Sequence, residues 1–468
     1  MSPFTVRKSV LFTVLLFLCL VRFSARGRES GLALAVFDVD ATPPVGSELA
    51  YQTMVNSGEL SLRARGVILI GSGKPIVLCS VDWIGIANGS QDAFKQALAE
   101  AAGTDPDRVE VHTVHQHDAP ICDFTAENML KEKGLPLDGF DGTFARTLLV
   151  NLRAAVTGAM PLARPVTRIG LGKAEVRKVA SNRTVRKKDG TFDTRYSSEP
   201  VRTEFRKLPE GRVDRELSMV SFWDDEEPLA ILTFYATHPQ SYYLTGVANP
   251  DFPGLARYME QLRHPDALFV HFNGAGGNIA AGKYNDGSHE MRLVLAKRLA
   301  EGMEKAWRKT KKFPVTSKDI AWFEEPMLLP YNHTFERKEE NLPGMERNAR
   351  SNGLPPLAWC KRRREGKSLH AACLAIGDKA RILFMPGELF VEYQLAAKKM
   401  ASEKFVAMAA YGDYGPFYIG TKEAFSRGGY EVRSSPVAPE AEDYILDILD
   451  RLLNRAGPEL SAPVSSRR

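Results

Sequence analysis

Residues 76–120 read IVLCSVDWIGIANGSQDAFKQALAEAAGTDPDRVEVHTVHQHDAP and contain the alternation that indicates the fold. The apolar runs at 76–81 and 109–114 are short and rich in Val and Ile, which is typical of buried strands. Between them, residues 91–102 have the spacing of an amphipathic helix. Strand, helix and strand in this order predict an α/β domain in which helices cover the sheets.

The same alternation continues through most of the 468 residues. Further strands are expected at 67–70, 231–235, 268–272, 382–385 and 405–409, and further helices at 144–160, 289–307 and 440–453. We therefore predict layered, mixed β-sheets flanked by helices in one large catalytic domain, residues 30–456, followed by a disordered tail at 457–468. Two polar insertions, 185–214 and 324–368, interrupt the pattern, and they either shape the mouth of a site or are mobile decorations.

The charge pattern argues against nucleic acid as a partner. The formal net charge is +5, and it falls to +2 without the three basic residues of the first 25 positions. A chain so close to neutral has no overall field that would attract nucleic acid. The basic run 361–364 is interpreted as a solvated loop, with a local phosphate patch as the alternative.

Residues 1–25 have the layout of a secretory signal. Basic residues precede the apolar run 10–21, and small residues follow it up to Ala25. The apolar run is too short to span about 30 Å of hydrocarbon comfortably. We therefore predict a secreted or cell-envelope protein cleaved near Ala25, with an uncleaved anchor as the alternative. Export permits disulfides, and Cys360 with Cys373 is the first pair to test.

Three of the nine histidines fall close together at the end of the strand predicted at 109–114. Side chains two positions apart on an extended chain project to the same side, so His115 and His117 would address one cavity. One would bind a metal, and the other would act as an acid/base or an oxyanion partner. His112 has the opposite parity and is expected to be a packed histidine. Two histidines alone leave the existence of a metal site open.

Three further segments place a polar side chain beside a turn. His238 stands between a β-rich run and a proline, and Glu388 follows a Met-Pro-Gly turn. Tyr418 and Tyr430 lie twelve positions apart in the last part of the chain. Each signal is weak when it is taken alone, and a structural role is the simpler interpretation for the histidine and the glutamate.

The order of these motifs resembles the neutral/alkaline non-lysosomal ceramidase family. Residues 40–46, DATPPVG, are similar to the family's opening D-I-T-P-P-x-G, and the His-x-His, Thr-His-Pro and Pro-Gly-Glu motifs follow in the family's order. The resemblance implies one zinc ion per chain, held by four ligands: His115, His238, Glu388 and Tyr418. It also implies that three residues contact the substrate or the developing oxyanion: His117, Arg183 and Tyr430.

The chain departs from the family pattern near the implied site. Gly274 stands where the family has a serine that is discussed as a nucleophile or a substrate-binding group, so a serine nucleophile is excluded at this position. The backbone amides of 274–277 would still donate hydrogen bonds. Asp118 and Ala119 replace Ser-Gly in the histidine loop, and they bring a carboxylate that could carry protons. We expect no counterpart of the family's immunoglobulin-like C-terminal domain after Tyr430.

The resemblance therefore implies an exported, zinc-dependent hydrolase that cleaves the N-acyl bond of a ceramide-like or related lipid by metal-activated water. The expected partner is this small-molecule or lipid-like amide, with peripheral membrane contact left open and no nucleic acid or protein partner. Two alternatives remain. One is an esterase or deacylase acting on another secreted conjugate, and the other is a catalytically inactive, metal-stabilised binding protein.

Overall fold

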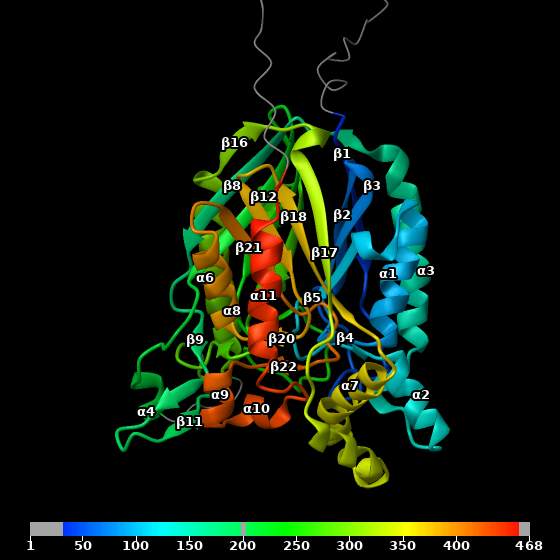
Figure 1. Cartoon of the computed structure of the whole chain (residues 1–468), viewed down its shortest axis with the longest axis vertical. Helices are drawn as coiled ribbons and strands as arrows, with labels where there is room; N and C mark the ends of the chain where they lie inside the picture. Colours follow the sequence, from blue (N-terminus) through cyan, green and yellow to red (C-terminus); the bar gives the residue numbers. More distant parts are fainter. Residues whose placement is uncertain (1–30, 198–202, 458–468) are drawn as a thin grey trace, which may run out of the picture.

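Three β-sheets of similar topology share one apolar core. The computed structural model describes residues 31–197 and 203–457, and Figure 1 shows the sheets side by side with helices around them. The predicted signal segment 1–25 and the tail beyond Gly457 lie outside the described residues. The layered α/β class expected from the sequence is confirmed.

The strands of each sheet come from one continuous part of the chain. The first sheet has the order β5-β3-β2-β1-β7 and consists of β1 (Ala33–Asp40), β2 (Arg63–Gly71), β3 (Gly73–Val81), β5 (Val109–Thr113) and β7 (Arg164–Pro165). The second has the order β14-β13-β12-β8-β16 and consists of β8 (Arg168–Glu175), β12 (Glu216–Asp224), β13 (Glu227–Tyr235), β14 (Leu268–Asn273) and β16 (Lys311–Pro314). The third has the order β17-β18-β19-β21 and consists of β17 (Ile320–Met327), β18 (Leu369–Ile376), β19 (Ala380–Phe384) and β21 (Phe405–Ala409).

Two helices cover the outer face of each sheet. They are α1 (Gly89–Ala102) and α3 (Thr143–Ala159) on the first, α5 (Asp251–Arg263) and α6 (His289–Arg308) on the second, and α8 (Val391–Met400) and α11 (Ala441–Asn454) on the third. The inner faces of all three sheets form the central core. In β2, Val67 and Leu69 lie in this core while Ile68 faces the helices, as the twofold period of a strand requires.

The three sheets repeat one connection, although the sequence shows no repeat. In each, two antiparallel pairs are followed by a parallel pair joined through a helix: β3-α1-β5, β13-α5-β14 and β19-α8-β21. Backbone and side-chain bonds tie the ends of the three pairs together. Asn273 Nδ2 donates to Val114 O at 3.2 Å, Ala410 N to Asn273 O at 2.9 Å, and Thr113 N to Tyr411 O at 2.9 Å. The loops after these strands therefore meet at one place, which is where sites form in parallel α/β sheets.

The two insertions are more ordered than their composition predicts. Residues 185–214 include β11 (Phe192–Thr194) and α4 (Thr203–Lys207), and β10 (Thr184–Arg186) begins just before them. Arg195 is 1% exposed and donates to backbone carbonyls that include Asn182 O at 2.8 Å. Arg195 therefore ties this segment to the body of the protein, while most of the segment's other described side chains are exposed or half-exposed.

The second insertion contains α7 (Arg347–Arg364), and the basic run 361–364 forms its last turn. The interpretation as a solvated loop is wrong, since basic side chains are favoured at a helix C-terminus, where the carbonyl dipoles point outward. Arg362 pairs with Asp92 at 2.6 Å, and Arg363 Nε donates to Leu329 O at 3.0 Å. These contacts hold the last turn of α7 against the rest of the protein.

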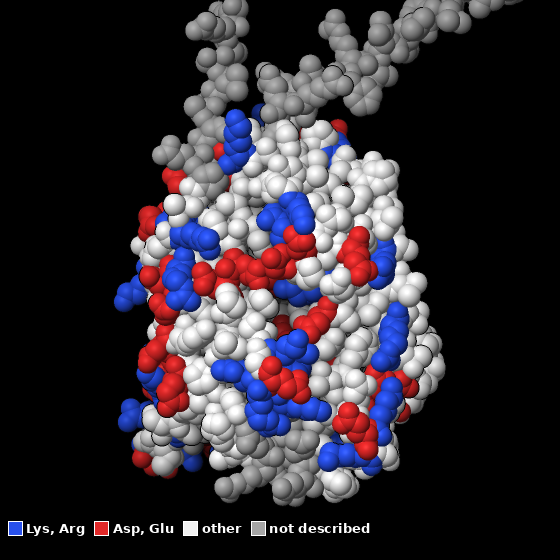
Figure 2. Space-filling view, turned by 45° about the vertical axis from the view of Figure 1, so that its right-hand side comes forward, with Lys and Arg blue, Asp and Glu red and all other residues white. Residues whose placement is uncertain are grey.

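Cys360 and Cys373 are buried and are not joined to each other, so the disulfide considered from the sequence is not formed. Within the described ranges, no helix is both long and apolar enough to cross a membrane. Figure 2 shows Lys and Arg interspersed with Asp and Glu on one face, without a large field of either sign. This pattern agrees with the small net charge of the sequence.

Candidate metal centre and active site

His115 reaches the site because the chain turns sharply after β5. The strand ends at Thr113, and His115 has a φ of 71°, in the left-handed region that histidine tolerates better than most residues. Its N–H donates to Trp83 O at 2.9 Å, and its Nδ1 lies 2.6 Å from Ile84 O. The strand parity proposed for His115 and His117 therefore does not apply, although both side chains enter one cavity.

His238 and Glu388 each follow the first strand of the parallel pair in the other two sheets, whereas His115 follows the second strand of its pair. His238 lies after β13, and its Nδ1 is 3.1 Å from Gly276 O in the loop after β14. Glu388 lies after β19 and begins β20 (Glu388–Leu389), which pairs in parallel with β22 (Tyr418–Ile419). This pairing places Glu388 directly beside Tyr418. Each sheet therefore contributes one of these polar side chains to the place where the strand ends meet.

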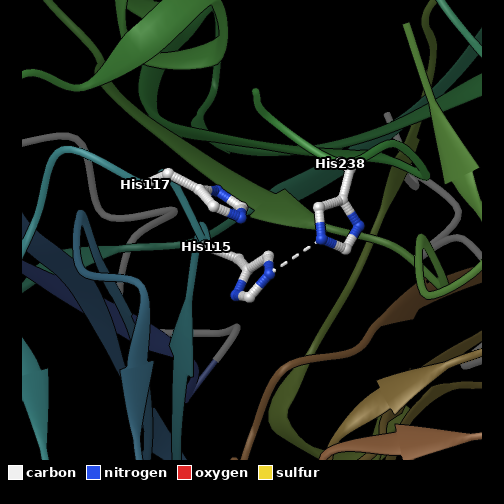
Figure 3. Close-up of side chains that lie close together, drawn as sticks. All are labelled: His115, His117 and His238. Atoms are coloured by element: carbon white, nitrogen blue, oxygen red, sulfur yellow. Dashed lines mark hydrogen bonds between the residues drawn. The ribbon is translucent and has the colours of Figure 1, made fainter. Parts of the chain in front are cut away.

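Three of the four predicted ligands bring their donor atoms within bonding reach of one point. The Nε2 atoms of His115 and His238 lie 3.1 Å apart, and the dashed line in Figure 3 joins them. Glu388 Oε2 lies 3.4 Å from the first of these atoms and 3.3 Å from the second. Donors about 2.0–2.2 Å from a tetrahedral zinc ion are separated by roughly 3.3–3.6 Å, so the spacing fits such an ion.

The hydrogen bonds of the two imidazoles leave both Nε2 atoms able to bind a cation at this point. Each Nδ1 faces a backbone carbonyl, so Nδ1 carries the proton and Nε2 keeps its lone pair. Two lone pairs and the carboxylate of Glu388 then face one another without a proton to share. Glu388 Oε2 is buried and makes no hydrogen bond. Because buried polar atoms are normally satisfied, a cation bound between the three residues would complete the cluster.

Tyr418 lies beside these three residues and lines the same cavity. Its ring is stacked on that of His238 with 6.4 Å between centroids, and its hydroxyl accepts from Arg183 Nη1 at 3.2 Å. His117 offers an alternative ligand, since the ligand atoms of His115, His117 and His238 lie within 4.8 Å of one another. His117 Nδ1 is buried and has no hydrogen-bond partner. Tyr418 as the fourth ligand therefore stays a prediction.

Two tyrosines of the site, Tyr411 and Tyr414, carry no sequence signal of their own. The Tyr414 hydroxyl donates to Glu388 Oε1 at 3.1 Å, which leaves Oε2 directed at the histidines. The Tyr411 ring is stacked on the ring of His115 with centroids 4.5 Å apart. Both residues orient predicted metal ligands, as the outer partners of metal sites do.

Arg183 and Tyr430 line the wall of the cavity. The Arg183 guanidinium lies 5.6 Å from the Tyr418 ring centre and 5.4 Å from that of Tyr430. Arg183 Nε pairs with Glu431 Oε1 at 3.3 Å, in α10 (Tyr430–Ser434). The ion pair and the two rings fix a buried positive charge beside the candidate metal position.

Burial sets the protonation states of the site. It lowers the pKa of His238 well below its ordinary value, and the charge of Arg183 lowers it further. Burial and the neighbouring His115 lower the pKa of His117 in the same way. Both imidazoles are therefore neutral near pH 7, which is the form that binds metals or accepts a proton. Burial raises the pKa of Tyr418 well above its ordinary value, although Arg183 opposes this shift.

The cavity above these residues has a volume of about 220 Å³. Both insertions reach it, through Tyr196 from the first and through Asn348 and Asn352 from the second, so they shape the mouth of the site. Its walls are mostly polar or aromatic: Tyr51, His115, His117, Arg183, Tyr196, His238, Gln240, Tyr243, Leu244, Asn348, Asn352, Glu388, Tyr414, Phe417, Tyr418 and Tyr430.

Comparison with known proteins finds a match at the level of the fold. No protein-family model matches the chain, and no curated protein sequence does either. A solved structure of the neutral ceramidase from Pseudomonas aeruginosa superposes with a TM-score of 0.62 over 92% of this chain and 76% of that chain, at 16% identity. A structure of a ceramidase complexed with C2 gives the same TM-score and identity over 92% and 77%.

The chain has the neutral ceramidase fold. The fold implied by the motif order is thus confirmed by an independent comparison of coordinates. Two proteins that share a fold at 16% identity can differ in activity. The chemistry of this chain must therefore be inferred from the residues of its own site.

Asp118 does not act as the proton carrier considered from the sequence. Its Oδ1 accepts from Gln52 Nε2 at 3.0 Å and from Leu244 N at 2.9 Å, and its Oδ2 accepts from the Thr245 hydroxyl at 2.7 Å. Asp118 is absent from the cavity wall, whereas Tyr243 and Leu244 form part of it. The extra carboxylate therefore fixes the loop that contributes Tyr243 and Leu244 to the cavity wall.

The glycine loop after β14 also differs from the expectation. Three of its four amides bind within the protein: Gly274 N to Tyr235 O at 2.9 Å, Ala275 N to Gln394 Oε1 at 2.9 Å, and Gly277 N to Leu389 O at 2.9 Å. These donors are not available to a substrate. The Gly276 carbonyl, which faces His238 Nδ1, is the group by which this loop serves the site.

Gly274→Ser should lower stability without raising turnover. A Cβ at this position would lie 2.6 Å from Gln394 Oε1 and 3.1 Å from Ala236 Cβ, both buried and outside the cavity wall. Displacing Gln394 should cost about 1–3 kcal/mol of the free energy of unfolding, as overpacking typically does. Urea unfolding and turnover would be measured beside Gly158→Ser, whose Cβ meets nothing within 4 Å. A serine that gained turnover and trapped an acyl group would contradict this geometry.

Proposed function

We propose that this chain is a metal-dependent amidohydrolase that cleaves the N-acyl bond of a ceramide-like or related lipid amide. The observation that carries the proposal is the convergence of His115 Nε2, His238 Nε2 and the unpartnered Glu388 Oε2 beneath a cavity lined by Arg183. This donor set fits zinc and leaves room for further ligands. The neutral ceramidase fold adds support, because neutral ceramidases are its solved neighbours.

A zinc ion held by His115, His238, Glu388 and Tyr418 would supply a Lewis acid and lower the pKa of a coordinated water to about 7. The chain's own residues do the rest. Arg183 and the Tyr430 hydroxyl donate toward the amide oxygen as negative charge develops on it. His117 is neutral and has an unpartnered Nδ1, so it takes up a proton from the attacking water and returns it to the leaving amine.

The composition of the cavity indicates which part of the substrate it receives. Arg183, Gln240, Asn348 and Asn352 offer hydrogen-bond donors, and about 220 Å³ is too little for a long acyl chain. We infer that the cavity holds the polar amide and hydroxyl portion. The alkyl chain then extends toward the mouth, where a peripheral contact with a membrane would deliver it.

A substrate panel tests this assignment. Purified protein would be assayed with ceramides of short and long acyl chains, with simple chromogenic amides and with the matching esters. We expect turnover of N-acyl lipid amides, and faster turnover of those with hydroxyl groups near the amide, because the cavity can bind them. Hydrolysis of the esters alone would instead support the esterase alternative. Zinc binding without turnover of any compound would support the inactive binding protein.

We further propose that the protein is exported to the cell envelope or secreted. The support is the signal-like composition of residues 1–25. N-terminal sequencing of protein from the envelope fraction should find a mature chain that begins near Arg26. An intact N-terminus in the membrane fraction would favour an uncleaved anchor, and one in the soluble cytoplasmic fraction would refute export.

A further inference from the structure

A second cluster of potential ligands lies where α5 and α6 pack together on the outer face of the second sheet. Glu260 belongs to α5, His264 follows its last residue, and Glu304 lies on α6. One ligand atom from each residue lies within 4.8 Å of the other two. His264 Nε2 and Glu304 Oε2 are 3.6 Å apart. The spacing of Glu260 and His264 along the helix places both on one face.

Two atoms of this cluster are buried without hydrogen bonds. Glu260 is fully buried, and neither its Oε2 nor His264 Nε2 makes a hydrogen bond. The other oxygens of the two glutamates are occupied, since Arg263 pairs with Glu260 Oε1 and Arg308 Nε pairs with Glu304 Oε1 at 2.6 Å. The arginines thus hold the outer oxygens and leave one oxygen of each carboxylate facing the imidazole. Burial raises the pKa of Glu260 to about 7, although the charge of Arg263 opposes this shift.

We propose that Glu260, His264 and Glu304 bind one divalent transition-metal ion, such as zinc, that joins α5 to α6. Two carboxylate oxygens and one imidazole nitrogen are a suitable donor set for such an ion. The side chains of His264 and Glu304 are 17% and 22% exposed, which leaves an entry path and room for water ligands. The ion satisfies the two buried atoms that the protein leaves without partners.

This site is distinct from the candidate active site and has a structural role. The segment that carries His238 is held at the opposite end of α5, where Asp251 Oδ2 accepts from Ser241 N at 3.0 Å. Arg292 of α6 donates from Nη2 to Tyr242 O at 2.8 Å in the same segment. A helix as long as α5, 13 residues, separates the two ends by roughly 20 Å. An ion that fixes α5 against α6 therefore stabilises the two helices that hold the segment carrying His238, although the ion itself lies at the other end of α5.

A proton on His264 is the rival occupant, since imidazolium between two carboxylates would also satisfy these atoms. The decisive experiment uses a background in which His115→Ala and His238→Ala remove the first site, so that failure of the proposed function does not affect the result. Native mass spectrometry after dialysis against zinc should find one ion per chain in this background. Adding Glu304→Gln should remove the bound zinc. Glu301→Gln should not remove it, because Glu301 lies one turn before Glu304, is exposed and pairs with Lys305.

Two further readouts keep the test independent of folding defects. Chelation should lower the Tm of the background protein by about 2–4 °C and should leave the Glu304→Gln variant unchanged. The ring centroid of Trp307 lies 4.5 Å from that of His264, so Co²⁺ should quench its fluorescence, and Trp307→Phe should reduce the quenching to the part that comes from the neighbouring Trp223. The proposal is overturned if the background protein binds no zinc, or if Glu304→Gln and Glu301→Gln bind it equally.

Discussion

Replacing His115 or His238 by alanine should remove the active-site ion and lower turnover by about 10³-fold or more, because a Lewis acid contributes several kcal/mol to the barrier. Each histidine supplies one of the three donor atoms that converge, with 3.1 Å between the two Nε2 atoms. The loss should appear both in kcat and in metal content measured by mass spectrometry. Chelation of the unaltered protein should have the same effect, and added zinc should reverse it.

The matched control is His370→Ala, because His370 is exposed and pairs with Glu324 on β17 outside the cavity. This variant should keep both metal and turnover. Full activity in metal-free protein, or in the His115→Ala variant, would contradict the assignment of the site. Since His115 is buried, circular dichroism must show that each variant is folded before the loss is attributed to the ion.

Tyr430→Phe and His117→Ala should each lower turnover by about 10²–10³-fold while the active-site ion stays bound. The tyrosine loses a donor to the developing oxyanion, and losses of this size are typical of such donors. The histidine loses the group that carries the proton. Turnover and metal content would be measured together, since retained metal separates these roles from that of a ligand.

The two variants have different controls. Tyr258→Phe removes the hydroxyl of a half-exposed tyrosine on α5 and should leave turnover unchanged. If His117→Ala lost the ion together with turnover, His117 would be a ligand, as its distance from His115 and His238 permits. Unchanged turnover in Tyr430→Phe would exclude its hydroxyl from oxyanion stabilisation.

The strands that could be predicted from the sequence, β2, β3, β5, β13, β14, β19 and β21, are short apolar runs in the buried interior. Val67 faces the central core and Ile68 the helices, so the strand is a continuous apolar run with clear ends. The similar topology of the three sheets could not be predicted, since it depends on pairing between strands and leaves no repeated motif. The composition of the first insertion does not predict the burial of Arg195. This basic residue lies in a polar stretch, yet it is buried and donates hydrogen bonds to backbone carbonyls.

The residues of the candidate site could be predicted together only because the order of their motifs resembles a known family. That resemblance connects residues that are far apart in the sequence. His115 and His238 are 123 positions apart, and nothing local connects them. Tyr414, which holds Glu388, has no recognisable spacing relative to the other site residues. The role proposed for Asp118 was wrong because its sequence position beside His117 does not reveal that its oxygens face the loop at Leu244.

Anomalous diffraction at the zinc edge, from crystals grown with zinc, tests the central claim most directly. The proposed site predicts a peak within about 2.0–2.2 Å of His115 Nε2, His238 Nε2 and Glu388 Oε2, and the motif resemblance adds the Tyr418 hydroxyl as the fourth protein ligand. A peak bound by His117 in place of Tyr418 would revise the fourth ligand alone. A zinc-loaded crystal without a peak between His115, His238 and Glu388 would contradict the account.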